Sequence, residues 1–336
     1  MSESYLEIIQ MVDAYKDNPP LIHIGYPRAL STWLQTCFFL PENGFNVMMD
    51  FYNTWEQIID RHCFNFDKTA IKYFLEDKFK ENFSPVITHE LLSGNPFHGG
   101  HDAKLLADRL KSIFPHARIL IIVREQKALI RSHYSLGIFF GASHSIDFFL
   151  NPSASRIVKP ALKPPAKFMY EYLKYHRVAG YYMKLYGNDN VLILPYEQFK
   201  LDPNVFIKTI DQFIGNPALT DEAIADLPFS KKINTIGLAG LNLELRRILN
   251  MLRQNGMLPD HINFSGVINE SQAGGTGQSG VFLRAMVRFF SQLMENAFEN
   301  RLKRKIEINA AGKFAESNRK LESLIGKKLS QYGYET

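Results

Sequence analysis

Short apolar runs alternate with longer amphipathic segments over the first two thirds of the chain. The segment Arg118–Val123 is apolar without interruption after its first residue, as expected of a strand in a parallel sheet covered on both faces. The same reasoning predicts strands at Leu21–Gly25, Pro85–His89 and Val191–Pro195. Strands that alternate with helices indicate an α/β fold, with a parallel sheet of about four to five strands flanked by helices.

The predicted helices have apolar residues at helical spacing. In the first two thirds of the chain they cover Tyr5–Tyr15, Ser31–Leu40, Asp102–Phe114, Gln126–Tyr134, Lys167–Tyr186 and Pro203–Ile214. Beyond about Asp221 no strand is predicted, and helical spacing continues in Leu238–Gln254, Gly280–Arg304 and Glu316–Leu329. We therefore predict a single domain over residues 1–336, with an α/β core at 1–215 and a helical C-terminal lobe at 216–336.

Composition and charge exclude several classes of protein. Hydrophobic residues make up 46% of the chain and charged residues 22%, which excludes a disordered or collagen-like chain. The 39 Lys and Arg exceed the 34 Asp and Glu by five, and this surplus is spread along the sequence. So small and diffuse a surplus argues against nucleic-acid binding, but it suits an enzyme whose ligand carries several negative charges.

The cysteines and the N-terminus indicate a cytoplasmic protein. Cys37 and Cys63 are the two cysteines, and their spacing excludes a disulfide framework or a cysteine zinc site. The first 20 residues mix acidic with apolar side chains and lack the pattern of a secretory signal. Because no run of about 18 apolar residues occurs, we expect no membrane span.

The segment Gly25–Thr32 links a predicted strand to a predicted helix, where ligands bind in open α/β sheets. Backbone N–H groups at a helix start attract anions, Arg28 adds positive charge, and Ser31 supplies a hydroxyl donor. A nucleoside triphosphatase loop would need a glycine at Leu30 and a lysine at Ser31. The segment therefore predicts a phosphate site held by protein cations, without a metal.

A second pair of residues is suited to the same type of ligand. Arg124 follows the strand Arg118–Val123, where an Mg²⁺ site would need an acidic residue, and Ser132 lies eight residues further on. A helix that starts after the strand places Ser132 about two turns along, where both residues could bind one phosphate. The alternative is an ordinary surface arginine and an unrelated helix serine.

Together these segments resemble the PAPS-dependent sulfotransferase family. The stretch YPRALSTWL is similar to the family's 5′-phosphosulfate loop, and the spacing of Arg124 and Ser132 is similar to its 3′-phosphate motif. The resemblance covers most of the chain, because it continues through Tyr196–Phe199, Asn318–Leu321 and Tyr332–Tyr334. It implies a P-loop-like sulfotransferase fold and transfer of a sulfuryl group from PAPS, which leaves PAP as product. The acceptor would be a hydroxyl or amine of a small molecule such as a secondary metabolite or a carbohydrate.

The resemblance also implies which residues hold the nucleotide, without a metal ion. These are Arg28, Ala29, Leu30, Ser31, Thr32, Trp33, Arg124, Ser132 and Tyr196. The chain departs from the family where Ala29 and Leu30 replace Ser-Gly, and where Arg28 replaces the lysine of cytosolic animal enzymes. The family's C-terminal RKGxxGxWK element is absent, and the glycine-rich segment Gly274–Gly280 is either its replacement or a surface loop.

His89 ends a predicted strand and, by the same resemblance, stands where the family has its catalytic histidine. A histidine can accept a proton at neutral pH, so His89 is the predicted general base for in-line attack, together with Arg28 at the reacting group. Glu90 is the rival base. The alternative for His89 is a structural, hydrogen-bonded histidine at a strand end.

Aromatic and histidine side chains in segments of weak periodicity are candidates for the wall of the acceptor site. They are Tyr52, Trp55, His133 and Phe139, for each of which core packing is the alternative. The acceptor itself and the oligomeric state do not follow from the sequence. Two other functions stay open: a kinase-type phosphotransferase, which Mg²⁺-dependent ATP turnover would support, and a non-catalytic nucleotide-binding module, which PAP binding without sulfation would support.

Overall fold

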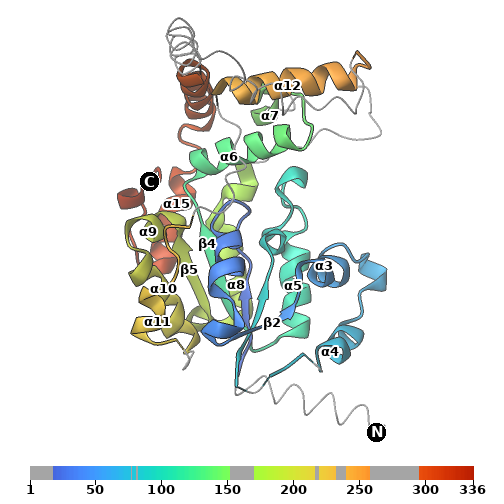
Figure 1. The fold of residues 1–336 in the computed structure, drawn as a ribbon, viewed down its shortest axis with the longest axis vertical. Coiled ribbons are helices and arrows are strands. Elements are labelled where there is room, and N and C mark those ends of the chain that lie inside the picture. Colours follow the sequence, from blue (N-terminus) through green and yellow to red (C-terminus); the bar gives the residue numbers. More distant parts are fainter. Residues whose placement is uncertain are drawn as a thin grey trace, which may run out of the picture. The chain divides into compact units, whose positions relative to one another are not determined.

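Five parallel strands form one sheet in the order β2-β3-β1-β4-β5 (Figure 1). Their bounds are β1 Leu21–His23, β2 Phe45–Met49, β3 Ser84–Thr88, β4 Arg118–Val123 and β5 Val191–Pro195. Strands β1 and β3 are buried along their whole length, and only Arg118 of β4 is partly exposed. The predicted parallel α/β sheet is therefore confirmed, and it has five strands.

The edge strand β2 was not predicted. Its buried residues include Asn46, which breaks the apolar pattern, and its pairing with β3 shifts register between Val47 and Met49. The Asn46 amide donates a hydrogen bond to the carbonyl of Lys78, so that its burial leaves the amide hydrogen-bonded. A partner 32 residues away is not visible in a local pattern, which is why the strand was missed.

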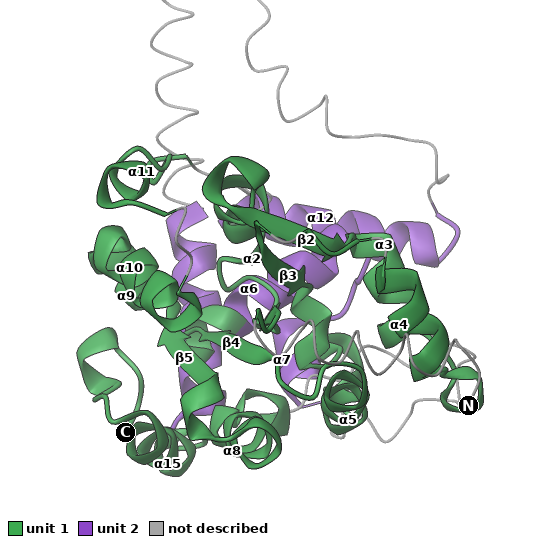
Figure 2. Cartoon of the chain, turned by 90° about the horizontal axis from the view of Figure 1, so that it is seen from below, with its two compact units in different colours: residues 1–129, 165–234, 312–336 green, residues 130–164, 235–311 purple. Residues whose placement is uncertain are grey.

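This computed structural model describes residues 18–76, 78–80, 82–151, 170–215, 219–231, 240–257 and 295–336. The predicted helix Tyr5–Tyr15, the segment Gly274–Gly280 and residues 280–294 of the predicted helix Gly280–Arg304 lie outside these ranges. The chain divides into two compact units, of residues 1–129, 165–234 and 312–336, and of residues 130–164 and 235–311 (Figure 2). The division into a core at 1–215 and a C-terminal lobe stays a prediction.

The first unit contains the sheet and most of the described helices. These are α2 Ser31–Trp33, α3 Phe51–Thr54, α4 Lys68–Glu76, α5 Ala103–Ile113, α8 Tyr175–Tyr186, α9 Tyr196–Leu201, α10 Pro203–Ile214, α11 Asp221–Ala225 and α15 Ala315–Ile325. Helix α8 packs against α5 and α15, and these three lie together on one side of the sheet (Figure 2). Helix α10 has the predicted bounds because Asp202 caps its start, Pro203 is its first residue and Gly215 ends it in a left-handed conformation.

Two predicted helices are not continuous α-helices in the structure. After α2 the chain continues as a π-helix at Leu34–Phe38, which ends two residues before the predicted end at Leu40. The predicted helix Lys167–Tyr186 is interrupted at Lys174, which separates a 3₁₀ turn at Tyr170–Leu173 from α8. The apolar spacing continues across this break, so periodicity alone did not reveal it.

The second unit is helical in its described part. It contains α7 Ile146–Leu150, α12 Gly240–Gln254 and a helix over residues 295–310, together with the larger part of α6 Gln126–Phe139, which begins in the first unit. Arg131 on α6 forms two hydrogen bonds of 2.9 Å with the carboxylate of Glu299. The buried Asn250 on α12 donates to the carbonyls of Ile138 and Ala142 at 2.7 and 2.9 Å. These contacts hold the three longer helices of this unit together.

Backbone pairing continues past the ends of β1 and β3. The N–H of Ile24 donates to Leu120, that of Tyr26 to Ile122, and that of His89 to His23. The segments that follow these strands therefore leave the sheet side by side at its carboxyl edge. In the described residues, no helix is both long enough and apolar enough to cross a membrane.

Candidate functional site

The loop after β1 adopts an unusual backbone conformation. Arg28 and Leu30 both have positive φ angles, of 70° and 72°, in a region that disfavours side chains with a Cβ atom. Leu30 is the residue before α2, and its side chain gives the helix no capping hydrogen bond. The loop therefore has the backbone of a glycine-containing turn, although leucine stands where the resembling family has glycine.

The Leu30 conformation leads to a stability prediction. Replacement by glycine should give a protein about 1 kcal/mol more stable than replacement by alanine, because both lose the leucine side chain but only glycine relieves the left-handed strain. Urea unfolding of the two variants measures the difference. An alanine variant as stable as the glycine variant would contradict the assigned backbone conformation.

Arg124 contacts two other residues that the sequence predicted for the nucleotide site. Its Nη1 donates a hydrogen bond to the carbonyl of Arg28 at 2.8 Å, and its guanidinium lies over the ring of Tyr196 at 5.1 Å. Its Nε is buried and has no hydrogen-bond partner among the described residues. The buried Tyr175 donates to the Arg124 carbonyl at 2.6 Å. Arg28, Arg124 and Tyr196 are thus brought together at the carboxyl edge of the sheet.

A buried polar network, which the sequence analysis did not predict, holds the two residues that follow Arg124 in the chain. Glu197 accepts hydrogen bonds from the Glu125 backbone N–H at 3.2 Å and from the Tyr334 hydroxyl at 3.0 Å. Gln126 and Asn318 exchange side-chain hydrogen bonds. The similarity of Asn318–Leu321 and Tyr332–Tyr334 to the family was the sequence signal that pointed to this network. Asn318 binds Gln126, which follows β4, and Tyr334 binds Glu197, which follows β5.

Residues 29–33 continue the loop into α2. Ala29 and Ser31 are buried, Thr32 is half-buried, and the Ser31 Oγ has no hydrogen-bond partner within the described ranges. The ring of Trp33 contacts those of Phe199 and Phe229, and its indole N–H donates to the carbonyl of Pro228 at 3.3 Å. Trp33 therefore anchors the start of the helix in an aromatic cluster.

His89 follows β3 and is completely buried. Its Nδ1 accepts a hydrogen bond from the backbone N–H of Leu91 at 3.1 Å, so it caps the 3₁₀ turn Glu90–Ser93. The Phe51 ring stacks on the imidazole at 4.2 Å, and the Trp55 ring lies 6.4 Å away. Burial lowers the pKa of His89 to about 4, since the charged imidazolium loses its hydration.

The other predicted residues lie at several places. Glu90 is half-buried in the turn after His89. Tyr52 is 80% exposed, and Trp55 is half-buried beside His89. Ser132, His133 and Phe139 belong to α6 in the second unit; the first two are buried and Phe139 is 36% exposed. It stays a prediction that one acceptor wall is formed by Tyr52, Trp55, His133 and Phe139.

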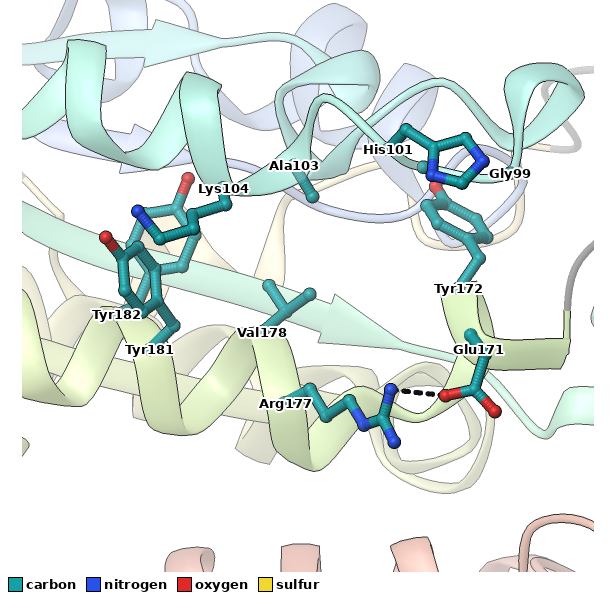
Figure 3. Close-up of a pocket in the computed structure, with 11 residues that line it drawn as sticks. Gly99, His101, Ala103, Lys104, Glu171, Tyr172, Arg177, Val178, Tyr181 and Tyr182 are labelled. Carbon is teal, nitrogen blue, oxygen red and sulfur yellow. Dashed lines mark ion pairs between the residues drawn. The ribbon is translucent and has the colours of Figure 1, made fainter.

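A cavity of about 350 Å³, which was not predicted, lies in the first unit along α5 and α8 (Figure 3). Its walls are the aromatic rings of Tyr172, Tyr181 and Tyr182 with Val178, and an ion pair between Arg177 and Glu171 lies at its rim. None of the residues that the sequence predicted for the site lines it. It therefore shares no residue with the predicted acceptor wall.

Comparison with known proteins decides the family. A family model described as a sulfotransferase domain matches residues 18–232, which is more than half of the chain. The chain belongs to the sulfotransferase domain family. The matched part of this sulfotransferase contains the loop after β1, His89, Arg124, Ser132 and Tyr196, and it ends before α12.

Solved structures that resemble this sulfotransferase are distant in sequence. A sulfotransferase from Alicyclobacillus acidocaldarius is 14% identical with a TM-score of 0.38, and the match covers 75% of this chain and 92% of that one. The sulfotransferase domain from the curacin biosynthetic pathway is 10% identical with a TM-score of 0.34, covering 74% of this chain and 95% of that one. A comparison with curated proteins found no match.

Proposed function

We propose that this sulfotransferase uses PAPS as sulfuryl donor and acts on a hydroxyl or amine of a small-molecule acceptor. The observation that carries the proposal is a set of buried polar atoms that lack a partner in the described part of the chain: Ser31 Oγ, Arg124 Nε and His89 Nε2. They follow β1, β4 and β3, which are neighbours in the sheet. Each such atom lowers the stability of the folded protein by about 1–3 kcal/mol when it is buried without a hydrogen-bond partner. The oxygens of an anionic ligand would supply the missing partners.

Charge and backbone geometry support an anion at the same edge. Arg28 and Arg124 contribute two positive charges, and the Arg124 guanidinium donates a hydrogen bond to the backbone carbonyl of Arg28. Helical structure begins at Ser31 without a side-chain cap and runs through the π-helix to Phe38. N–H groups at such a helix start attract phosphate oxygens. We assign Arg28, Ala29, Leu30, Ser31 and Thr32 to the 5′-phosphosulfate, Arg124 and Ser132 to the 3′-phosphate, and Trp33 and Tyr196 to the nucleoside.

The reaction forms a bond between the acceptor atom and sulfur while the bond from sulfur to the bridging oxygen breaks. The electron pair of the broken bond leaves on that oxygen, as part of the PAP phosphate. Cations beside the leaving phosphate stabilise the charge that develops there. Arg28 and Arg124 are the residues that we propose for this role, and His89 is the residue that we place at the transferring group.

PAP is expected to bind this sulfotransferase equally well with and without EDTA, because arginines and a helix start, rather than Mg²⁺, would hold its phosphates. Calorimetry with PAP measures this, and transfer of ³⁵S from labelled PAPS to candidate acceptors measures the reaction. A strict Mg²⁺ requirement with ATP turnover would instead support a phosphotransferase. PAP binding without transfer to any acceptor would support a non-catalytic module.

A further inference from the structure

The hydrogen bond at Nδ1 determines where the His89 ring carries its proton. Nδ1 accepts from the backbone N–H of Leu91 at 3.1 Å, so this nitrogen must keep its lone pair. A neutral imidazole has one N–H and one acceptor nitrogen, and the proton must then lie on Nε2. The cap at the start of the 3₁₀ turn thus selects one tautomer of His89.

The environment of Nε2 is that of a donor that lacks an acceptor. Nε2 is buried and has no hydrogen-bond partner among the described residues, and the ring is covered by Phe51 at 4.2 Å. Burial that lowers the pKa of His89 to about 4 keeps the ring neutral at neutral pH. The Phe51 side chain that stacks on one face of the ring is itself 47% exposed, so His89 lies directly beneath the protein surface.

We propose that His89 acts in sulfuryl transfer as a neutral Nε2–H hydrogen-bond donor to an oxygen of the transferring or leaving group, and not as the general base. This inference rests on the proposed function. An Nε2 atom that already carries a proton cannot accept another while Nδ1 is held by Leu91 N–H. The role differs from the one expected from sequence, where the type of residue and its position were visible but the tautomer was not.

The chemistry remains balanced without a histidine base. The acceptor oxygen or nitrogen forms its bond to sulfur, the bridging oxygen leaves with the electron pair, and the acceptor's proton passes to water. The Nε2–H of His89 stabilises the negative charge on oxygen as that charge increases, as donors in oxyanion sites do. Its hydrogen is not transferred.

Two near-isosteric variants separate the two roles. In His89→Gln the amide nitrogen can take the place of Nε2 and donate, but an amide cannot act as a base. In His89→Asn the side-chain oxygen takes the place of Nδ1 and can cap Leu91 N–H, but no donor reaches the Nε2 position. We expect His89→Gln to keep turnover within about tenfold of wild type, while His89→Asn and His89→Ala lose about 100-fold or more. Equal loss in all three variants would overturn the proposal.

A second measurement reads the tautomer directly and does not need turnover. Long-range ¹H–¹⁵N NMR of protein labelled at its ten histidines distinguishes Nε2–H from Nδ1–H rings, and the signals that His89→Asn lacks belong to His89. We expect the Nε2–H form with and without PAP. The Nδ1–H form, in either state, would overturn the proposal. Failure of wild type to bind PAP or transfer sulfate would count against the proposed function instead, and the tautomer would still be measured.

Discussion

Replacement of Arg124 by alanine is expected to weaken PAP binding by about 10- to 150-fold. Loss of a hydrogen bond to a charged group costs about 1.5–3 kcal/mol, and Arg124 is held in place by the Arg28 carbonyl and the face of Tyr196. Calorimetry with PAP gives the affinities. Arg124→Lys should lie between wild type and alanine, because lysine keeps the charge but loses the planar fork.

Two comparisons test the assignment to the 3′-phosphate. Adenosine 5′-phosphosulfate lacks that phosphate, so its affinity should fall much less in Arg124→Ala, and the same holds for Ser132→Ala with a smaller effect. Arg118 starts the same strand at its opposite end and serves as a matched control, since Arg118→Ala removes the same charge away from the site. Equal weakening for both nucleotides, or an equal effect of Arg118→Ala, would refute the assignment.

Acidification from about pH 7 to about pH 5 is expected to destabilise the protein by about 2 kcal/mol through His23 alone. His23 is completely buried, its Nδ1 is hydrogen-bonded to the Thr88 hydroxyl at 2.8 Å, and burial lowers its pKa to about 3. Below about pH 6.5 the unfolded chain binds a proton at His23 that the folded protein does not bind. Unfolding therefore becomes more favourable as the pH falls, down to the folded pKa, and His89 contributes in the same direction.

Urea unfolding at both pH values measures this effect when wild type is compared with His23→Asn, which cannot titrate but can still hydrogen-bond to Thr88. The variant should lose about 2 kcal/mol less stability on acidification. His116 is exposed, so His116→Asn should leave the difference between the two pH values unchanged. The same pH dependence in wild type and His23→Asn would show that His23 is protonated in the folded protein.

The sequence alone predicted the central strands and which charged and histidine residues follow them. A continuous apolar run such as that of β4 predicts a buried parallel strand, because a strand covered on both faces has no polar side. Parallel strands end at one edge, so Arg28, His89 and Arg124 could be assigned to a common edge from their positions after predicted strands. Local pattern and strand direction suffice for these features.

Tertiary structure decided whatever depends on partners far apart in the chain. Asn318 binds Gln126, 192 residues away in the chain, and Tyr334 binds Glu197, 137 residues away. No local periodicity of the sequence predicts such contacts. The edge strand β2 likewise accommodates Asn46 through a hydrogen bond to the Lys78 carbonyl. The His89 tautomer follows from the backbone geometry of the turn at Leu91, because a histidine in a sequence has two nitrogens and only its neighbours in space select which one carries the proton.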